Sequence, residues 1–278
     1  MTFKSWESRL GFCSWSVRPE SIDDLLSAAS QIGLKRVQLH LNPLCDEGKS
    51  WFATAAKLQK AGIAIGSGMV GCVGEDYTTI ESIHRTGGVV PDDTWPSTFT
   101  NLHIAAPLIA ALGIERVTMH AGFIPSDTAD PIYAKVLDRI RKVADLFGGY
   151  GASVALETGQ EAAPTLKRFF QDVERENVFI NFDPANMLLY GSGDPIDALK
   201  LLLPHVGSCH IKDGVRSAKT GEWGEEVPVG KGQVPWKEFF AVLDDGKFAG
   251  DLMIEREAGE QRILDIRHAV DELRTLGG

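Results

Sequence analysis

The feature that most constrains the fold is an apolar run that ends in a side chain able to bind a metal ion. It occurs four times, with residues 153–156 leading to Glu157, 178–182 to Asp183, 206–209 to His210, and 251–254 to Glu255. Each run has the length of a β-strand, and most are followed by a stretch of helical character. This alternation is typical of βαβ units in a parallel sheet.

The N-terminal half has the same alternation. We predict strands over residues 10–15, 36–41, 63–70 and 115–120, and helices over 22–31, 50–60, 97–112 and 131–147. Ser21 occupies a helix N-cap position, and Gly33 and Gly62 follow predicted helices as stop signals. Further helices are expected over 162–174, 195–203 and about 259–276. The chain thus shows eight strand–helix units without a linker. We predict a single domain over residues 1–278, of the α/β class and folded as a closed (β/α)8 barrel.

In such a barrel, the right-handed crossovers place the C-terminal ends of all strands on one face. The four strand-end side chains would therefore converge there, although 98 residues separate Glu157 from Glu255. Three carboxylates and one imidazole suit Mn²⁺, Mg²⁺ or Co²⁺, and they do not exclude Zn²⁺. One polar residue at a strand end is ordinary, whereas four on successive strands favour one divalent-metal site at this face.

Short motifs surround these four residues: Glu-Thr-Gly-Gln-Glu at 157–161, Asp-Pro-Ala-Asn at 183–186, His-Ile-Lys-Asp at 210–213, and Ile-Glu-Arg-Glu at 254–257. In these motifs, and over nearly its whole length, the chain resembles the xylose isomerase-like TIM barrels of the sugar phosphate isomerase/epimerase group. The resemblance implies that Glu157, Asp183, His210 and Glu255 hold one divalent ion. It also implies that Glu157 and Glu255 form an acid/base pair. The expected activity is isomerisation or epimerisation of a ketose or keto-sugar through a metal-stabilised enediolate.

The chain departs from the ketose 3-epimerases of this group at two positions. Asn186 stands where they carry a His, and Ala163 stands where they carry a second Glu, which Glu161 could replace. One alternative is therefore a metal-dependent lyase or dehydratase acting on a keto-sugar or inositol-like substrate. A phosphodiesterase of the abasic-site endonuclease type is disfavoured, because it needs several metals and a basic face. A sugar-binding barrel without catalysis also stays open.

Five side chains are candidates for substrate binding: His120, Glu161, Asn186, Lys212 and Trp15. Three of them also have a plainer interpretation. His120 could make only a local hydrogen bond, Lys212 a surface ion pair, and Trp15 a packing contact inside the barrel. Alternation along a strand places Lys212 on the same side as His210.

Two long connections, 71–96 and 214–234, could serve as lids or be insertions without a role. In the second, we expect Glu225 and Glu226 to be solvated. Arg256 should point away from Glu255 and form a salt bridge with a helix.

The net charge of −10 argues against nucleic acid or an anionic membrane as a partner. The four cysteines lack CxxC spacing, and the sequence shows neither an apolar leader nor an 18-residue apolar stretch. We therefore expect a cytoplasmic protein with a small-molecule carbohydrate as its partner, and a homo-oligomer is possible. The sequence also lacks the glycine motifs of nucleotide-binding loops.

Overall fold

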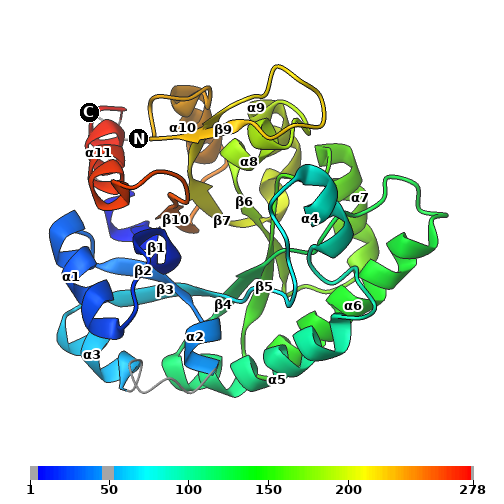
Figure 1. Cartoon of the computed structure of the whole chain (residues 1–278), viewed down its shortest axis with the longest axis horizontal. Coiled ribbons are helices and arrows are strands. Elements are labelled where there is room, and N and C mark those ends of the chain that lie inside the picture. Colours follow the sequence, from blue (N-terminus) through cyan, green and yellow to red (C-terminus); the bar gives the residue numbers. More distant parts are fainter. Residues whose placement is uncertain (1–5, 46–52, 277–278) are drawn as a thin grey trace.

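In the computed structural model, which describes residues 6–45 and 53–276, eight parallel strands close into a barrel surrounded by helices (Figure 1). Around the barrel the order is β1-β10-β7-β6-β5-β4-β3-β2. The strands are β1 (Leu10–Cys13), β2 (Arg36–His40), β3 (Ala64–Met69), β4 (Arg116–Met119), β5 (Ser153–Glu157), β6 (Val178–Phe182), β7 (Val206–Ile211) and β10 (Asp251–Ile254). The predicted α/β class and (β/α)8 barrel are confirmed.

The helices lie outside the barrel or over its ends (Figure 1). They are α1 (Ile22–Ile32), α2 (Asn42–Cys45), α3 (Thr54–Lys60), α4 (Ile80–Thr86), α5 (Trp95–Leu112), α6 (Pro131–Gly148), α7 (Ala163–Val173), α8 (Pro184–Leu189), α9 (Pro195–Leu202), α10 (Trp236–Asp245) and α11 (Arg262–Leu276). The predicted N-cap at Ser21 is confirmed, because its side chain accepts a hydrogen bond from the Asp24 backbone N–H. Residues 50–52 of the predicted second helix lie outside the described part of the chain.

Two local predictions were wrong. The first strand ends at Cys13, and Trp15 lies in a 3₁₀ turn, Ser14–Val17, rather than in the strand. A helix, α8, begins directly after Asp183, whereas the sequence pattern predicted no helix between 174 and 195. The Asp183 carboxylate accepts hydrogen bonds from two backbone N–H groups of α8, and Pro184 suits the first helical position.

The connection after β7, which the sequence shows only as a long segment between two units, contains a two-stranded hairpin of β8 (Asp213–Val215) and β9 (Glu225–Val227). The buried Asp213 carboxylate holds the segment after β9 in place, because it accepts hydrogen bonds from the backbone N–H groups of Gly230, Gly232 and Val234 and from the Trp236 indole. A Cβ on Gly232 would lie 2.1 Å from an Asp213 oxygen, so this approach requires glycine. Residues 230–232, with the sequence Gly-Lys-Gly, therefore wrap around the Asp213 carboxylate.

Polar side chains reach across the barrel interior just below its C-terminal face. Gln38 on β2 contacts Thr118 on β4 and His210 on β7, and none of these three strands is adjacent to another. All three side chains are fully buried. The interior thus carries a hydrogen-bonded layer beneath the strand ends. None of the helices in the described ranges is long and apolar enough to cross a membrane.

Candidate metal centre

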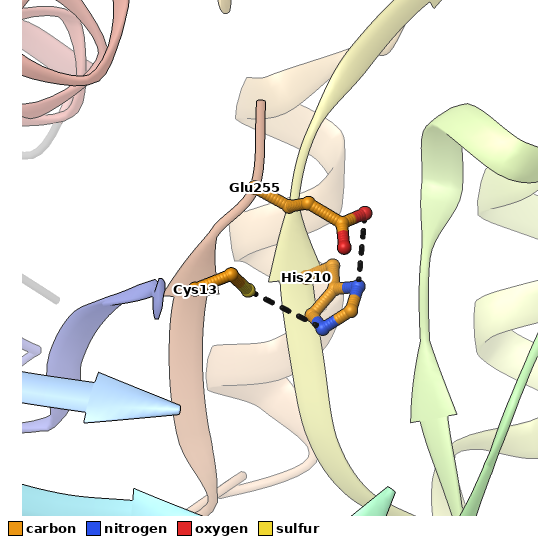
Figure 2. A group of neighbouring side chains, drawn as sticks. All are labelled: Cys13, His210 and Glu255. Atoms are coloured by element: carbon orange, nitrogen blue, oxygen red, sulfur yellow. Dashed lines mark hydrogen bonds and ion pairs between the residues drawn. The ribbon is translucent and has the colours of Figure 1, made fainter. Parts of the chain in front are cut away.

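Four strand-end side chains meet at the C-terminal face of the barrel. Glu157 is the last residue of β5, His210 lies on β7, and Asp183 and Glu255 directly follow β6 and β10. One ligand atom from each lies within 4.8 Å of those from the others. His210 Nδ1 is central, at 3.3 Å from Glu157 Oε1, 3.6 Å from Asp183 Oδ2 and 3.4 Å from Glu255 Oε2. Figure 2 shows Glu255 and His210 facing each other from neighbouring strands.

Two atoms of this cluster test whether it fits a cation. Asp183 Oδ2 and His210 Nδ1 are buried, and neither has a hydrogen-bond partner among the described residues. Leaving a buried carboxylate oxygen unpaired is costly. Both atoms point toward the other carboxylates of the cluster. The donor set and its unpaired atoms therefore fit one divalent ion held by oxygen and nitrogen ligands.

The electrostatics of the cluster agree with this interpretation. Burial would lower the pKa of His210, but Glu255 and Glu157 raise it well above its usual value. Burial would raise the pKa of Glu255, but Lys212 and His210 hold it far below the usual range. For Asp183, burial prevails and the pKa is raised. The cluster thus attracts positive charge strongly, as an ion-binding site must.

Glu255 is fixed by two neighbours that the sequence had suggested as substrate ligands. The Trp15 indole N–H donates to Glu255 Oε1 at 2.8 Å, and Lys212 Nζ donates to Oε2 at 2.9 Å. Lys212 also contacts Glu257 at 2.7 Å and is only 3% exposed. Lys212 thus forms an ion pair, as in its plainer interpretation, but the pair is buried at the site rather than on the surface, and a substrate contact by Lys212 stays a prediction.

Glu157 has a different environment. The Asn186 side chain, carried by α8, donates to Glu157 Oε1 at 2.8 Å, and His120 Nε2 lies 3.7 Å from Oε2. The Tyr77 ring lies against His120, with 5.9 Å between centroids. Burial would raise the pKa of Glu157, but His210 and His120 lower it. The structure thus brings Asn186 and His120 to this carboxylate.

Glu161 lies outside the four-residue cluster. Its Oε1 accepts a hydrogen bond from the Ile124 backbone N–H at 2.8 Å, which holds the connection between β4 and α6. Burial raises the pKa of Glu161 to about 8. A substrate contact by Glu161 stays a prediction.

The segment after β10 is held by the hairpin. Arg256 pairs with Asp265 of α11 at 2.9 Å, which confirms the predicted salt bridge to a helix. Arg256 also pairs with Glu226 at 2.7 Å, and Glu226 accepts from the Glu257 backbone N–H. Glu225 is exposed as expected, but solvation of Glu226 was a wrong prediction, because β9 directs this carboxylate toward Arg256.

Two functional candidates escaped the sequence analysis. Gln38 is fully buried, and its Oε1 lies 2.8 Å from His210 Nε2. Cys13 Sγ lies 3.7 Å from the same nitrogen (Figure 2). Gln38 could have been noticed in the sequence, because it is a polar amide within the largely apolar run 37–41. Cys13 could not, because a buried free cysteine is indistinguishable in sequence from a small hydrophobic residue.

Two of three comparisons with known proteins extend over nearly the whole chain. A family model described as xylose isomerase-like TIM barrel matches residues 13–276. A crystal structure of a xylose isomerase domain protein from Planctomyces limnophilus is 33% identical, with a TM-score of 0.84, covering 90% of this chain and 91% of that one. YihM of Escherichia coli, described as uncharacterized, is 29% identical over 110 residues, which are 39% of this chain and only 33% of YihM.

More distant solved structures share the fold. The probable 3-DHS dehydratase AsbF from Bacillus anthracis has a TM-score of 0.72 and 19% identity, covering 95% of this chain and 98% of its own. A D-psicose 3-epimerase, solved in the presence of D-fructose, has a TM-score of 0.71 and 17% identity, covering 97% and 100%. The same barrel therefore occurs in an epimerase and in a probable dehydratase.

Proposed function

The chain belongs to the xylose isomerase-like TIM barrel family, and from this premise we propose that it is a divalent-metal-dependent sugar isomerase or epimerase. The proposed substrate is a ketose or keto-sugar, as the D-psicose 3-epimerase among its structural neighbours suggests. Glu157, Asp183, His210 and Glu255 would hold the ion, and Glu157 and Glu255 would also transfer protons. We propose Mn²⁺, Mg²⁺ or Co²⁺ before Zn²⁺, because three of the four ligands are carboxylates.

One observation carries this proposal: four ligand atoms within 4.8 Å of one another, with Asp183 Oδ2 and His210 Nδ1 buried and unpaired among the described residues. A divalent ion bound there would supply Lewis acidity toward a carbonyl oxygen and its neighbouring hydroxyl.

The protein's own contribution is the placement of two carboxylates. Glu157 and Glu255 come from β5 and β10, which β6 and β7 separate, so they reach the site from different flanks. One carboxylate would take the proton from the carbon next to the carbonyl, and the other would return it. Return to the opposite face of that carbon is epimerisation, and return to the neighbouring carbon is isomerisation. Asn186 and His120 would orient Glu157, whereas Trp15 and Lys212 would orient Glu255.

A lyase or dehydratase reaction is the second candidate, and Lys212 is the observation that favours it. Its ammonium group is buried beside Glu255 and Glu257, where it could protonate a departing hydroxyl or other leaving group. The probable dehydratase among the structural neighbours is consistent with such chemistry on this fold.

One experiment separates these candidates. The protein, loaded with Mn²⁺, is incubated in deuterated water with a panel of ketoses and keto-sugars, and the products are analysed by NMR and mass spectrometry. Deuterium at carbon in a product of unchanged formula supports the isomerase or epimerase, whereas loss of water or of a substituent supports the lyase. Chelation should abolish either activity, and added Mn²⁺ should restore it. Full turnover after complete metal removal would contradict both candidates.

We also propose a cellular compartment for the protein and the absence of one class of partner. Four free thiols and the net charge of −10 support a reducing, cytoplasmic setting without nucleic acid as a partner. Size-exclusion chromatography with light scattering would test for a homo-oligomer.

A further inference from the structure

Gln38 lies directly behind the imidazole of His210, on the side away from the carboxylates. Its Oε1 lies 2.8 Å from His210 Nε2, and its Nε2 lies 2.9 Å from Thr118 Oγ1. The Cys13 thiol contacts the same Oε1 at 3.2 Å. All four side chains are completely buried, so water does not compete for these hydrogen bonds.

The direction of each hydrogen bond follows from the far end of this chain of contacts. Thr118 Oγ1 donates to the Gly68 backbone carbonyl at 3.4 Å, and a carbonyl oxygen can only accept. The Thr118 oxygen is then left to accept from the Gln38 amide NH₂, which turns Gln38 Oε1 toward His210. This oxygen also can only accept, so His210 Nε2 must carry a proton.

We propose that Gln38 is a positioning residue, which, with Thr118, fixes the His210 ring and the proton on its Nε2 so that the neutral imidazole presents a bare Nδ1 to a metal ion. The inference rests on the proposed metal site. A histidine ligand needs a partner for its second nitrogen, because that partner sets both the tautomer and the ring orientation.

The same geometry decides between two groups of side chains that could hold a metal ion. Cys13, His210 and Glu255 form a second possible set, shown in Figure 2, but Cys13 approaches His210 from the Nε2 side. Because Nε2 carries a proton, which it donates to Gln38 Oε1, this nitrogen has no free lone pair to bind a metal. Nδ1 faces Glu157, Asp183 and Glu255 instead. Gln38 thereby selects the oxygen-rich set over the one that contains sulfur.

The test measures Mn²⁺ affinity of the metal-free protein by isothermal titration calorimetry. Gln38→Leu removes the acceptor at similar size, and we expect Mn²⁺ to bind about 10- to 100-fold more weakly. Gln38→Glu keeps an acceptor for the Nε2 proton and should bind Mn²⁺ within about threefold of wild type. Cys13→Ala is the matched control, because Cys13 touches both Gln38 and His210 yet should change the affinity by less than about twofold. If Gln38→Leu does not fold, Thr118→Val replaces it and should weaken binding to a smaller degree.

Nitrogen-15 NMR of histidine side chains in the Mg²⁺-loaded protein gives a readout that a structural role alone would not move. The His210 signals, identified by their loss in His210→Gln, should show a proton on Nε2 and none on Nδ1. A proton on Nδ1, or equal loss of affinity in Cys13→Ala and Gln38→Leu, would overturn the inference. Unchanged Mn²⁺ affinity in Gln38→Leu would overturn it while leaving the proposed function intact. A wild-type protein that binds no Mn²⁺, Mg²⁺ or Co²⁺ would contradict the proposed function and this inference together.

Discussion

Strand β10 carries a buried carboxylate at each end, and the two are neutralised in different ways. At its start, Asp251 pairs with Arg36, whose Nε lies 2.8 Å from Oδ1 and whose Nη2 lies 3.2 Å from Oδ2. Just beyond its other end, Glu255 lies among Glu157, Asp183 and His210. The N-terminal end of the barrel thus pairs its carboxylate with a guanidinium of the same chain. The C-terminal end gathers three carboxylates around one imidazole.

This difference indicates which end is structural and which is poised for a ligand. Asp251 has its counter-charge within the chain, because the Arg36 guanidinium lies at ion-pair distance from one of its oxygens and donates a hydrogen bond to the other. At the other end, Lys212 and His210 cannot satisfy every carboxylate, and Asp183 Oδ2 has no hydrogen-bond partner among the described residues. Glu161 shows a third way to accommodate a buried carboxyl group. Burial raises its pKa to about 8, so it is largely protonated, and therefore uncharged, at neutral pH. Asp251, Glu161 and the cluster thus show three arrangements of buried carboxyl groups: paired with arginine, kept neutral, or gathered for a cation.

The largest effect is expected from breaking the C-terminal cluster. Glu157→Gln preserves shape and the hydrogen bond to Asn186, but it removes the proposed base, so turnover should fall by about 10³-fold or more. The fold should survive, because the carboxylates of the cluster repel one another. Turnover is measured as deuterium incorporation into whichever sugar of the panel the wild type is found to convert, and folding is checked by circular dichroism.

Glu255→Gln should behave in the same way, whereas Asp251→Asn, at the other end of β10, should leave turnover within about twofold of wild type. Full activity in either glutamine variant would remove that residue from the acid/base pair.

The next effect should appear in stability rather than in turnover. Asp251→Asn leaves the Arg36 guanidinium without its ionic partner and should lower the free energy of unfolding by about 3 kcal/mol, the low end for a buried pair. The low end applies because the Arg36 side chain is 29% exposed and keeps part of its hydration. Urea denaturation measures the change. A loss of Mn²⁺ affinity comparable to that of a ligand variant would show that the two ends are not independent.

The contrast between the two ends also explains what the sequence could reveal. Glu157, Asp183, His210 and Glu255 could be found because parallel strands place their C-terminal ends together, so only the order of strands had to be inferred. The eight-stranded barrel followed from the same alternation.

Contacts across the barrel could not be found in this way. Gln38 reaches His210 over 172 residues of sequence, and Trp15 reaches Glu255 over 240. Such contacts depend on side-chain reach and on the register of each strand, which alternation of apolar residues does not encode. The 214–234 connection escaped for a related reason, because its hairpin is held by Asp213 rather than by a strong strand pattern.

A pH-dependent effect of comparable size should distinguish Glu161 from the cluster. Its pKa is raised by burial to about 8, above the value of about 4.3 for an unfolded chain. The folded state therefore holds the proton more tightly than the unfolded chain does. The protonated Glu161 makes its full contribution to the free energy of unfolding below pH ~4.3, and this contribution is lost as the pH rises toward ~8. Glu161→Gln keeps an acceptor for Ile124 and should be more stable than wild type by about 3.5 kcal/mol at pH 7, with little difference at pH 4. Thermal unfolding across pH measures this, and a constant difference at every pH would contradict it.

The smallest effect concerns two tryptophans that each donate to a carboxylate, one at each end of the barrel. Trp15 donates to Glu255 at 2.8 Å, and Trp6, which precedes β1, donates to Asp244 at 3.2 Å. Trp15→Phe keeps the ring but removes the donor, and the loss of about 1 kcal/mol in orienting Glu255 should lower kcat about fivefold. Trp6→Phe should lower thermal stability slightly and leave kcat unchanged. Equal kcat values for both variants would mean that Glu255 is held well enough without the indole, because Lys212 donates to its other oxygen at a comparable distance, 2.9 Å.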